Sequence, residues 1–180
     1  MTERTVATGG DPRLGRATLG LIAGLLVQFL LGMFVNLFVT IPDDHPGARP
    51  TEYFGGAVQS VQWATTAGPP ALALHAFVGI VLFVGALGLV VRVRRLLQRF
   101  LTTWATLGLL MIVAAGFNGA SFLNYNEDFS SMLMAVFFAL AVLSYGLILY
   151  RLGAEAMRAA GNHQGSSGPA AFDDSEIAVR

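Results

Sequence analysis

The sequence predicts an all-α, polytopic membrane protein: a four-transmembrane-helix bundle with an extra amphipathic helix in the first outer loop. Three observations predict this fold class. Of the 180 residues, 54% are hydrophobic and 12% are charged, and the mean hydropathy is +0.62, which is too apolar for an ordinary soluble domain. The apolar residues form four runs that are each long enough to cross a bilayer. Ten of the eleven arginines lie at the two chain ends and in the connection at residues 92–99, which all fall on one side of the bundle.

The first apolar run, residues 17–40, would be about 36 Å long as a helix, which is enough to cross a bilayer with some tilt. Small and amide residues recur along it at every fourth position and so form one ridge of the helix: Gly20, Gly24, Gln28, Gly32 and Asn36. An amide in hydrocarbon needs a hydrogen-bonding partner, whereas leucine, valine and phenylalanine can face lipid. We therefore expect this row to face other helices.

The other three spans are predicted at residues 70–91, 100–123 and 130–150. Pro70 opens the second span, where its missing N–H group is harmless. Tyr145 lies near the end of the last span, where an aromatic belt at the membrane surface is expected.

The longest connection, residues 41–69, divides into two parts. Three prolines between residues 42 and 50 exclude a regular helix from the first part. In residues 51–66, Phe54, Val58 and Val61 recur at helical spacing. This pattern predicts a short amphipathic helix that lies on the membrane surface.

The charges predict the orientation and the limits of the membrane domain. All eleven basic residues are arginines, and only Arg49 falls on the side of the bundle that also carries the acidic loops. By the positive-inside rule, both termini are cytoplasmic, in a bacterial plasma membrane. We expect a cytoplasmic amino-terminal segment at residues 1–16, a membrane domain at residues 17–152, and a largely disordered cytoplasmic tail at residues 153–180.

Three polar residues are expected in one layer, about one helical turn inside the outer ends of three spans: Asn36, His75 and Asn118. An ionisable group inside a membrane is a functional hypothesis by default, so this layer is a candidate cofactor-binding site. The alternative is that the three side chains bond to each other or to carbonyl groups and hold the helices together.

Haem b is the most specific cofactor that this layer could bind, because histidine is a common axial ligand of haem iron. His75 is the only histidine within a predicted span. The second ligand would then be Met33, Met132 or the His75 of another subunit. The competing interpretation is a histidine that only packs between helices.

A second candidate site lies outside the membrane, where acidic residues and a histidine flank the bundle: Asp43, Asp44, His45, Glu127 and Asp128. Carboxylates with an imidazole are a plausible ligand set for a divalent metal ion. Alternatively, the carboxylates belong to a proline-rich turn and to the start of the fourth span, where they would favour the positive end of the helix.

The sequence disfavours several classes of function. It contains no cysteine, which excludes disulfides and cysteine-based zinc sites. It has no Ser-His-Asp set, phosphate-binding glycine loop or HExxH motif, so an enzyme is disfavoured. No basic and aromatic surface indicates nucleic-acid binding.

Two stretches carry a resemblance: residues 28–38 continuing into Ile41-Pro42-Asp43-Asp44-His45-Pro46, and residues 116–122, Gly-Phe-Asn-Gly-Ala-Ser-Phe. They resemble small four-span integral membrane proteins of actinobacteria to which no function is assigned. The resemblance implies an architecture and a source, but no activity. The length is similar to that of the DoxX-like four-span family, but no diagnostic residue of that family matches.

The leading hypothesis is a structural or accessory component of a membrane complex, in contact with the lipid bilayer and with other membrane subunits or a second copy of itself. The alternative is a haem- or small-ligand-binding redox protein that uses the polar layer near the outer face. A small transporter is the third hypothesis. It is less favoured because Gln28 is the only strongly polar residue expected near the middle of the membrane, which argues against a continuous hydrophilic path.

Overall fold

The structure is a computed structural model that describes residues 12–165, with side chains described to residue 162. The described chain folds into five helices and no strand: α1 (Pro12–Phe38), α2 (Tyr53–Thr66), α3 (Pro70–Arg95), α4 (Arg99–Tyr125) and α5 (Asp128–Gly165). Four of them, α1, α3, α4 and α5, are long and apolar enough to cross a membrane. The predicted all-helical class and the four candidate spans are therefore confirmed.

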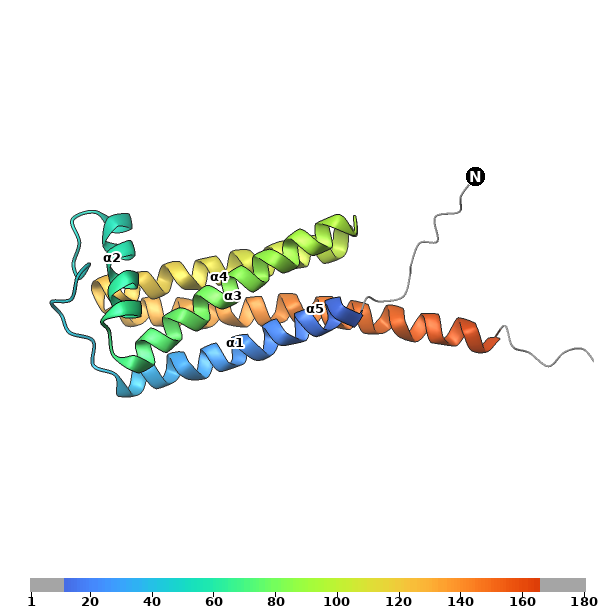
Figure 1. The fold of residues 1–180 in the computed structure, drawn as a ribbon, viewed down its shortest axis with the longest axis horizontal. Coiled ribbons are helices and arrows are strands. Elements are labelled where there is room, and N and C mark those ends of the chain that lie inside the picture. The colour runs from blue at the N-terminus through green and yellow to red at the C-terminus, as the bar shows by residue number, and fades with distance from the viewer. Residues whose placement is uncertain (1–11, 166–180) are drawn as a thin grey trace, which may run out of the picture.

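The four long helices are neighbours in a closed order. Within the described residues, α1 packs against α3 and α5, and α4 packs against the same two helices, whereas α1 and α4 do not contact each other. Successive long helices run in opposite directions (Figure 1), so α1 begins at the same end of the molecule toward which α5 runs. We call the end at which α2 lies the cap end.

The cap consists of the loop 39–52 and α2, which lies across the ends of α3 and α4 (Figure 1). Glu52 begins α2 by accepting hydrogen bonds from the backbone N–H groups of Phe54 and Gly55. The helix buries its small residues against α3 and α4, namely Gly56, Ala57, Ser60 and Ala64. Phe54 and Val58 of the predicted apolar face are 65% and 67% exposed, and the Phe54 ring makes only an edge contact with Phe117 of α4.

The main difference from the predicted boundaries lies at the end of α5. The fourth span was predicted to stop at residue 150, with a disordered tail from residue 153, but the helix continues to Gly165. Arg151 Nε donates to Glu155 Oε1 at 2.9 Å, an i,i+4 pair that supports the continuation. Alanine-rich residues follow it and favour helix. The rest of the predicted tail, like residues 1–11, lies outside the described residues.

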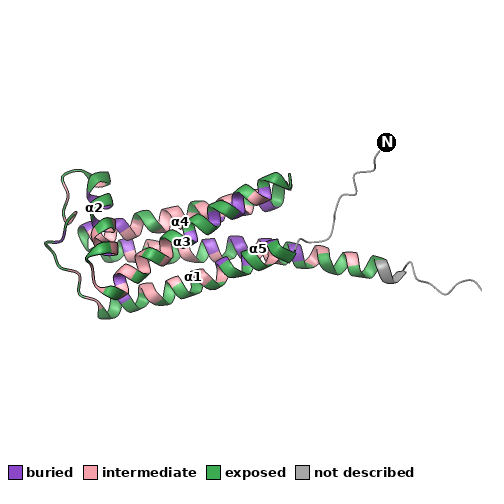
Figure 2. Ribbon diagram, in the orientation of Figure 1, coloured by how far each residue is buried: buried purple, intermediate pink, exposed green. Residues whose placement is uncertain are grey.

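The buried residues form two clusters of different size. The larger cluster fills the end opposite the cap, where all four long helices contribute leucine, isoleucine, valine or alanine side chains. The smaller cluster, at the cap end, is Val35 of α1, Ala64 of α2 and Leu72 of α3. Exposed residues cover much of the long helices (Figure 2), and many are large and apolar, such as Leu30 and Leu37, as expected of membrane spans.

Tyr145 is the largest fully buried side chain and lies in the larger cluster. Its ring packs directly on Gly108 of α4, where an added Cβ atom would lie only 2.6 Å from the Tyr145 Cζ atom. The expected place in an aromatic belt is therefore wrong for Tyr145. A ring at a helix–helix contact gains packing from both helices, and the glycine opposite provides the space.

Candidate functional site

The polar contact inside the four long helices is made by Gln28 of α1 and His75 of α3. The Gln28 Nε2 group lies 3.2 Å from His75 Nε2 and donates to the His75 backbone oxygen at 3.0 Å. Two bonds from one amide nitrogen thus tie α1 to a single residue of α3. Such a pair gives the Gln28 amide nitrogen and His75 Nε2 the partners that hydrocarbon cannot provide.

These contacts define the hydrogen positions on the His75 ring. An amide nitrogen only donates, so His75 Nε2 must accept, and the imidazole is neutral with its proton on Nδ1. Turning the Gln28 amide over would place its oxygen against the His75 carbonyl oxygen, which is unfavourable. His75 Nδ1 and Gln28 Oε1 are buried and have no hydrogen-bond partner among the described residues.

Glycines surround the Gln28–His75 pair, and two of them belong to the row of small and amide residues that was predicted on α1. A Cβ atom on Gly32 would lie 2.9 Å from His75 Cε1, and one on Gly79 would lie 3.2 Å from Gln28 Nε2. Gly24 faces Leu82 of α3 in the same way. The middle of the row therefore faces another helix as expected.

The two ends of the row do not face a helix. Gly20 has nothing within 4 Å of the position of an added Cβ atom, and Asn36 is exposed.

The expected layer of Asn36, His75 and Asn118 is not assembled in the described residues. His75 faces Gln28 and Gly32, which lie about two turns and one turn before Asn36 on α1, and Asn36 itself is exposed. Asn118 Nδ2 instead donates to Ala114 O of its own helix at 2.8 Å.

The surroundings of His75 do not fit an axial ligand of haem. The Nε2 atom, which would approach the iron, is closed off by the Gln28 amide, and the neighbouring Cε1 atom packs against Gly32. The two cavities described below lie at the cap end and include neither His75 nor Met33 or Met132. A packing role for His75 therefore agrees better with the geometry.

A second set of buried polar residues holds the cap on the bundle. The Asn124 amide at the end of α4 lies 2.7 Å from Ser60 Oγ. With its nitrogen turned toward the surrounding oxygens, the amide also donates to Gly47 O at 3.2 Å and to Ala120 O at 3.3 Å. The Asn124 backbone oxygen accepts from Arg49 N at 2.8 Å. One residue of α4 thus contacts both the loop and α2.

His45 makes the other connection between the loop and the helices. Its ring is buried, with Nε2 3.0 Å from Leu123 O and Nδ1 2.9 Å from Pro46 O. The ring stacks on Trp63 of α2, with 4.3 Å between centroids and 11° between planes. Both ring nitrogens therefore face backbone carbonyl groups rather than open space.

The five predicted metal ligands are not brought together. Asp43 and Asp44 are exposed in the loop, His45 is occupied as above, and Asp128 lies in the first turn of α5. No group of three or more histidine, aspartate or glutamate residues that could hold a metal ion occurs among the described residues. The position of Asp128 matches the alternative of a carboxylate at a helix start.

Sequence reasoning missed the residues that fasten α2. Besides Ser60 and Asn124, the Tyr53 hydroxyl lies 2.7 Å from Ser121 Oγ and donates to Phe117 O at 3.1 Å. The available signal was the small-residue face Gly56, Ser60 and Ala64, which marks a close helix contact. The prediction relied instead on the larger apolar residues Phe54 and Val58, which lie on another face of α2.

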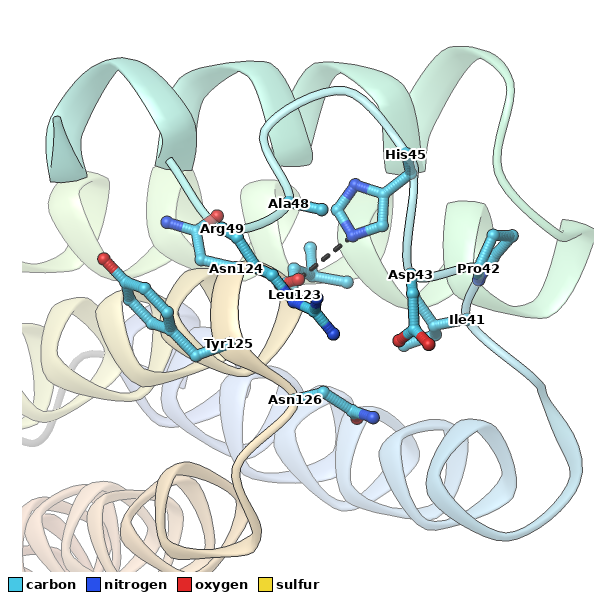
Figure 3. A pocket seen from close by; sticks show the side chains of 10 residues that line it. All are labelled: Ile41, Pro42, Asp43, His45, Ala48, Arg49, Leu123, Asn124, Tyr125 and Asn126. Carbon is cyan, nitrogen blue, oxygen red and sulfur yellow. Dashed lines mark hydrogen bonds between the residues drawn. The ribbon is translucent and has the colours of Figure 1, made fainter. Parts of the chain in front are cut away.

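Two cavities open at the cap end. The first, of about 280 Å³, is lined by residues of the loop and of the α4 end, including Asp43, Arg49 and Asn126 (Figure 3). The second, of about 190 Å³, shares Ile41 and Asn126 with the first and continues between α1 and α4. Polar side chains of two segments thus meet next to a recess that is lined by both apolar and polar residues.

Comparison of the chain with protein-family models, with curated proteins and with solved structures gives no match. The function must therefore be inferred from the geometry itself.

Proposed function

We propose that this chain is a multi-pass protein of the bacterial plasma membrane, with both termini in the cytoplasm, and that it acts as a non-enzymatic accessory component of a larger membrane complex. The actinobacterial source and the four-helix bundle with an outer amphipathic helix belong to the same proposal. The single observation that carries the accessory function is the Gln28–His75 pair. The one histidine of the spans is used to hold two helices together.

The arginine distribution supports the orientation. The end of α3, the start of α4 and the last part of α5 carry arginines, whereas the cap has only Arg49. The cap would then face the outside, and its folded loop would present a fixed surface there.

The length of α5 supports contact with another subunit. A helix of 38 residues is about 57 Å long, whereas a bilayer with its headgroups is about 40–45 Å thick. The last turns of α5 therefore extend into the cytoplasm. None of residues 153–162 is buried against the rest of this chain, so this extension is available to a partner.

A photo-crosslinking experiment in cells tests the proposal. A photoreactive amino acid replaces Met157 in the extension or Met132 near the start of α5; the two residues share one helix and are 72% and 53% exposed. We expect a discrete adduct with another membrane polypeptide from position 157 and only lipid adducts from position 132. The same adducts from both positions, or none from position 157, would contradict an accessory role of this extension.

An absorption spectrum of the purified protein separates this proposal from the haem alternative. The proposal predicts a colourless protein in both the oxidised and the reduced state. A stoichiometric Soret band that disappears in His75→Ala would show instead that the pair opens to bind haem.

A further inference from the structure

The larger cavity at the cap end holds two opposite charges that are not paired with each other. The Arg49 guanidinium and the Asp43 carboxylate reach it from two parts of the loop and face each other across it (Figure 3). Within the described residues, neither side chain forms a hydrogen bond or an ion pair. A cation and an anion separated by a cavity are complementary to a ligand that carries both charges.

The backbone holds both sides of this cavity in place. Arg49 has a positive φ of 48°, which is unfavourable for a residue with a side chain and persists only where the surroundings impose it. Here the bond from Arg49 N to Asn124 O imposes it. Asn126 also has a positive φ, 54°, as the residue that ends α4, and its amide adds a polar group to the cavity.

The second cavity adds apolar side chains to the site, next to the polar Asn36 and Thr40. These apolar residues are Val35 of α1, Val39 just after it and Phe122 of α4, and the cavity joins the first one at Ile41 and Asn126. A ligand that fits both cavities has a zwitterionic head and an apolar tail.

We infer that the cap end binds one phosphatidylethanolamine molecule, with its phosphate beside Arg49, its ammonium group beside Asp43 and the start of an acyl chain in the recess between α1 and α4. A primary ammonium group can donate hydrogen bonds to the Asp43 carboxylate, which a choline headgroup cannot do. An anionic lipid would satisfy Arg49 but would place no positive charge near Asp43. The cavity lies at the ends of the spans, where headgroups are located, whichever leaflet the cap faces.

Native mass spectrometry of the whole protein tests this inference. The protein is placed in nanodiscs with equal amounts of phosphatidylethanolamine, phosphatidylcholine and phosphatidylglycerol, and the lipids that remain bound after release are identified. We expect one phosphatidylethanolamine per chain, preferred about tenfold over each of the others, as one charge-assisted hydrogen bond would provide. Equal retention of the three lipids, or a preference for phosphatidylglycerol, would overturn the inference without any variant.

Matched variants locate the site. Asp43→Asn should abolish the preference for ethanolamine over choline, and Arg49→Gln should lose the bound lipid. Asp44→Asn is the control, because Asp44 is adjacent and exposed but does not line the cavity. If Asp43→Asn and Asp44→Asn had the same effect, the assignment would be wrong.

A final comparison distinguishes the lipid from a free headgroup. Soluble phosphoethanolamine should displace the bound lipid only at a concentration at least about a hundredfold above that of the lipid, because burial of apolar surface supplies part of the affinity. If the free headgroup displaced the lipid at a concentration similar to that of the lipid itself, the apolar side chains of the recess would have no role in binding.

Discussion

The two ends of the molecule are stabilised by different interactions. At the end opposite the cap, aliphatic side chains of four helices surround Tyr145, and packing supplies the contacts. At the cap end, few apolar residues are buried, and His45, Ser60 and Asn124 bind the loop and α2 through hydrogen bonds. Packing of long helices requires that they be close along their whole length, whereas the cap depends on a few directional contacts. The comparison therefore predicts that the cap can open without separation of the long helices.

The largest effect is expected for Tyr145→Ala. Removal of this fully buried ring leaves a cavity between α4 and α5 and should lower the free energy of unfolding by about 3–5 kcal/mol. Thermal unfolding in detergent measures this loss of stability. Tyr150→Ala, at an exposed position of the same helix, should change stability by less than about 0.5 kcal/mol. Equal losses in the two variants would refute the packing account of this end.

The next effect is expected for Gly47→Ala, in the cap. Gly47 has φ of 89° and lies so close to α2 that an added Cβ atom would overlap Gly56 O and Ser60 Oγ. The strained backbone alone costs about 1–3 kcal/mol. Hydrogen exchange should speed up in residues 45–66 and stay unchanged in α5. Faster exchange throughout the chain would show that the cap and the bundle unfold together.

Gly116→Ala is the control for that substitution, because nothing lies within 4 Å of its added Cβ atom. Exchange in the cap should be the same as in the wild type.

The Gln28–His75 pair lies between the two regions. We expect it to contribute less to the free energy of unfolding than the two features above. A double-mutant cycle with Gln28→Leu and His75→Leu should give a coupling energy of about 0.6 kcal/mol, and no more than about 1.7 kcal/mol. Unfolding in a denaturing detergent measures the three variants against the wild type. Strictly additive losses would show that the observed bonds between Gln28 and His75 contribute no stability.

Tyr145→Phe should have the smallest effect, and of opposite sign. The Tyr145 hydroxyl is buried with no hydrogen-bond partner among the described residues. Its removal should raise the free energy of unfolding by about 1 kcal/mol or less. A loss of stability would indicate that the hydroxyl finds a partner in the membrane-inserted protein.

The elements were predictable where one physical signal dominates. Four long apolar runs determine four long helices, and the glycines around Gln28 indicated the face of α1 that packs. The partner of His75 was not predictable, because the relative depth of two helices depends on loop geometry and not on the residues within either helix. The same holds for Asn124, whose partners Gly47 and Ser60 come from distant segments.

The surfaces of α2 show a different reason for error. A valine or phenylalanine stripe on a short helix predicts burial in a soluble protein, but near a membrane it can equally face lipid. The buried face of α2 consists of small residues, whose packing value comes from close approach rather than from apolar area.

The difference between the two ends can be measured directly because the chain has two tryptophans, one in each region. Trp63 stacks on His45 in the cap, and Trp104 packs against the larger buried cluster. Two single-tryptophan proteins, Trp104→Phe and Trp63→Phe, are unfolded with increasing denaturant and followed by fluorescence. The account predicts that the Trp63 signal changes at a clearly lower denaturant concentration than the Trp104 signal. Coincident transitions would contradict it and show that the cap and the four long helices form one cooperative unit.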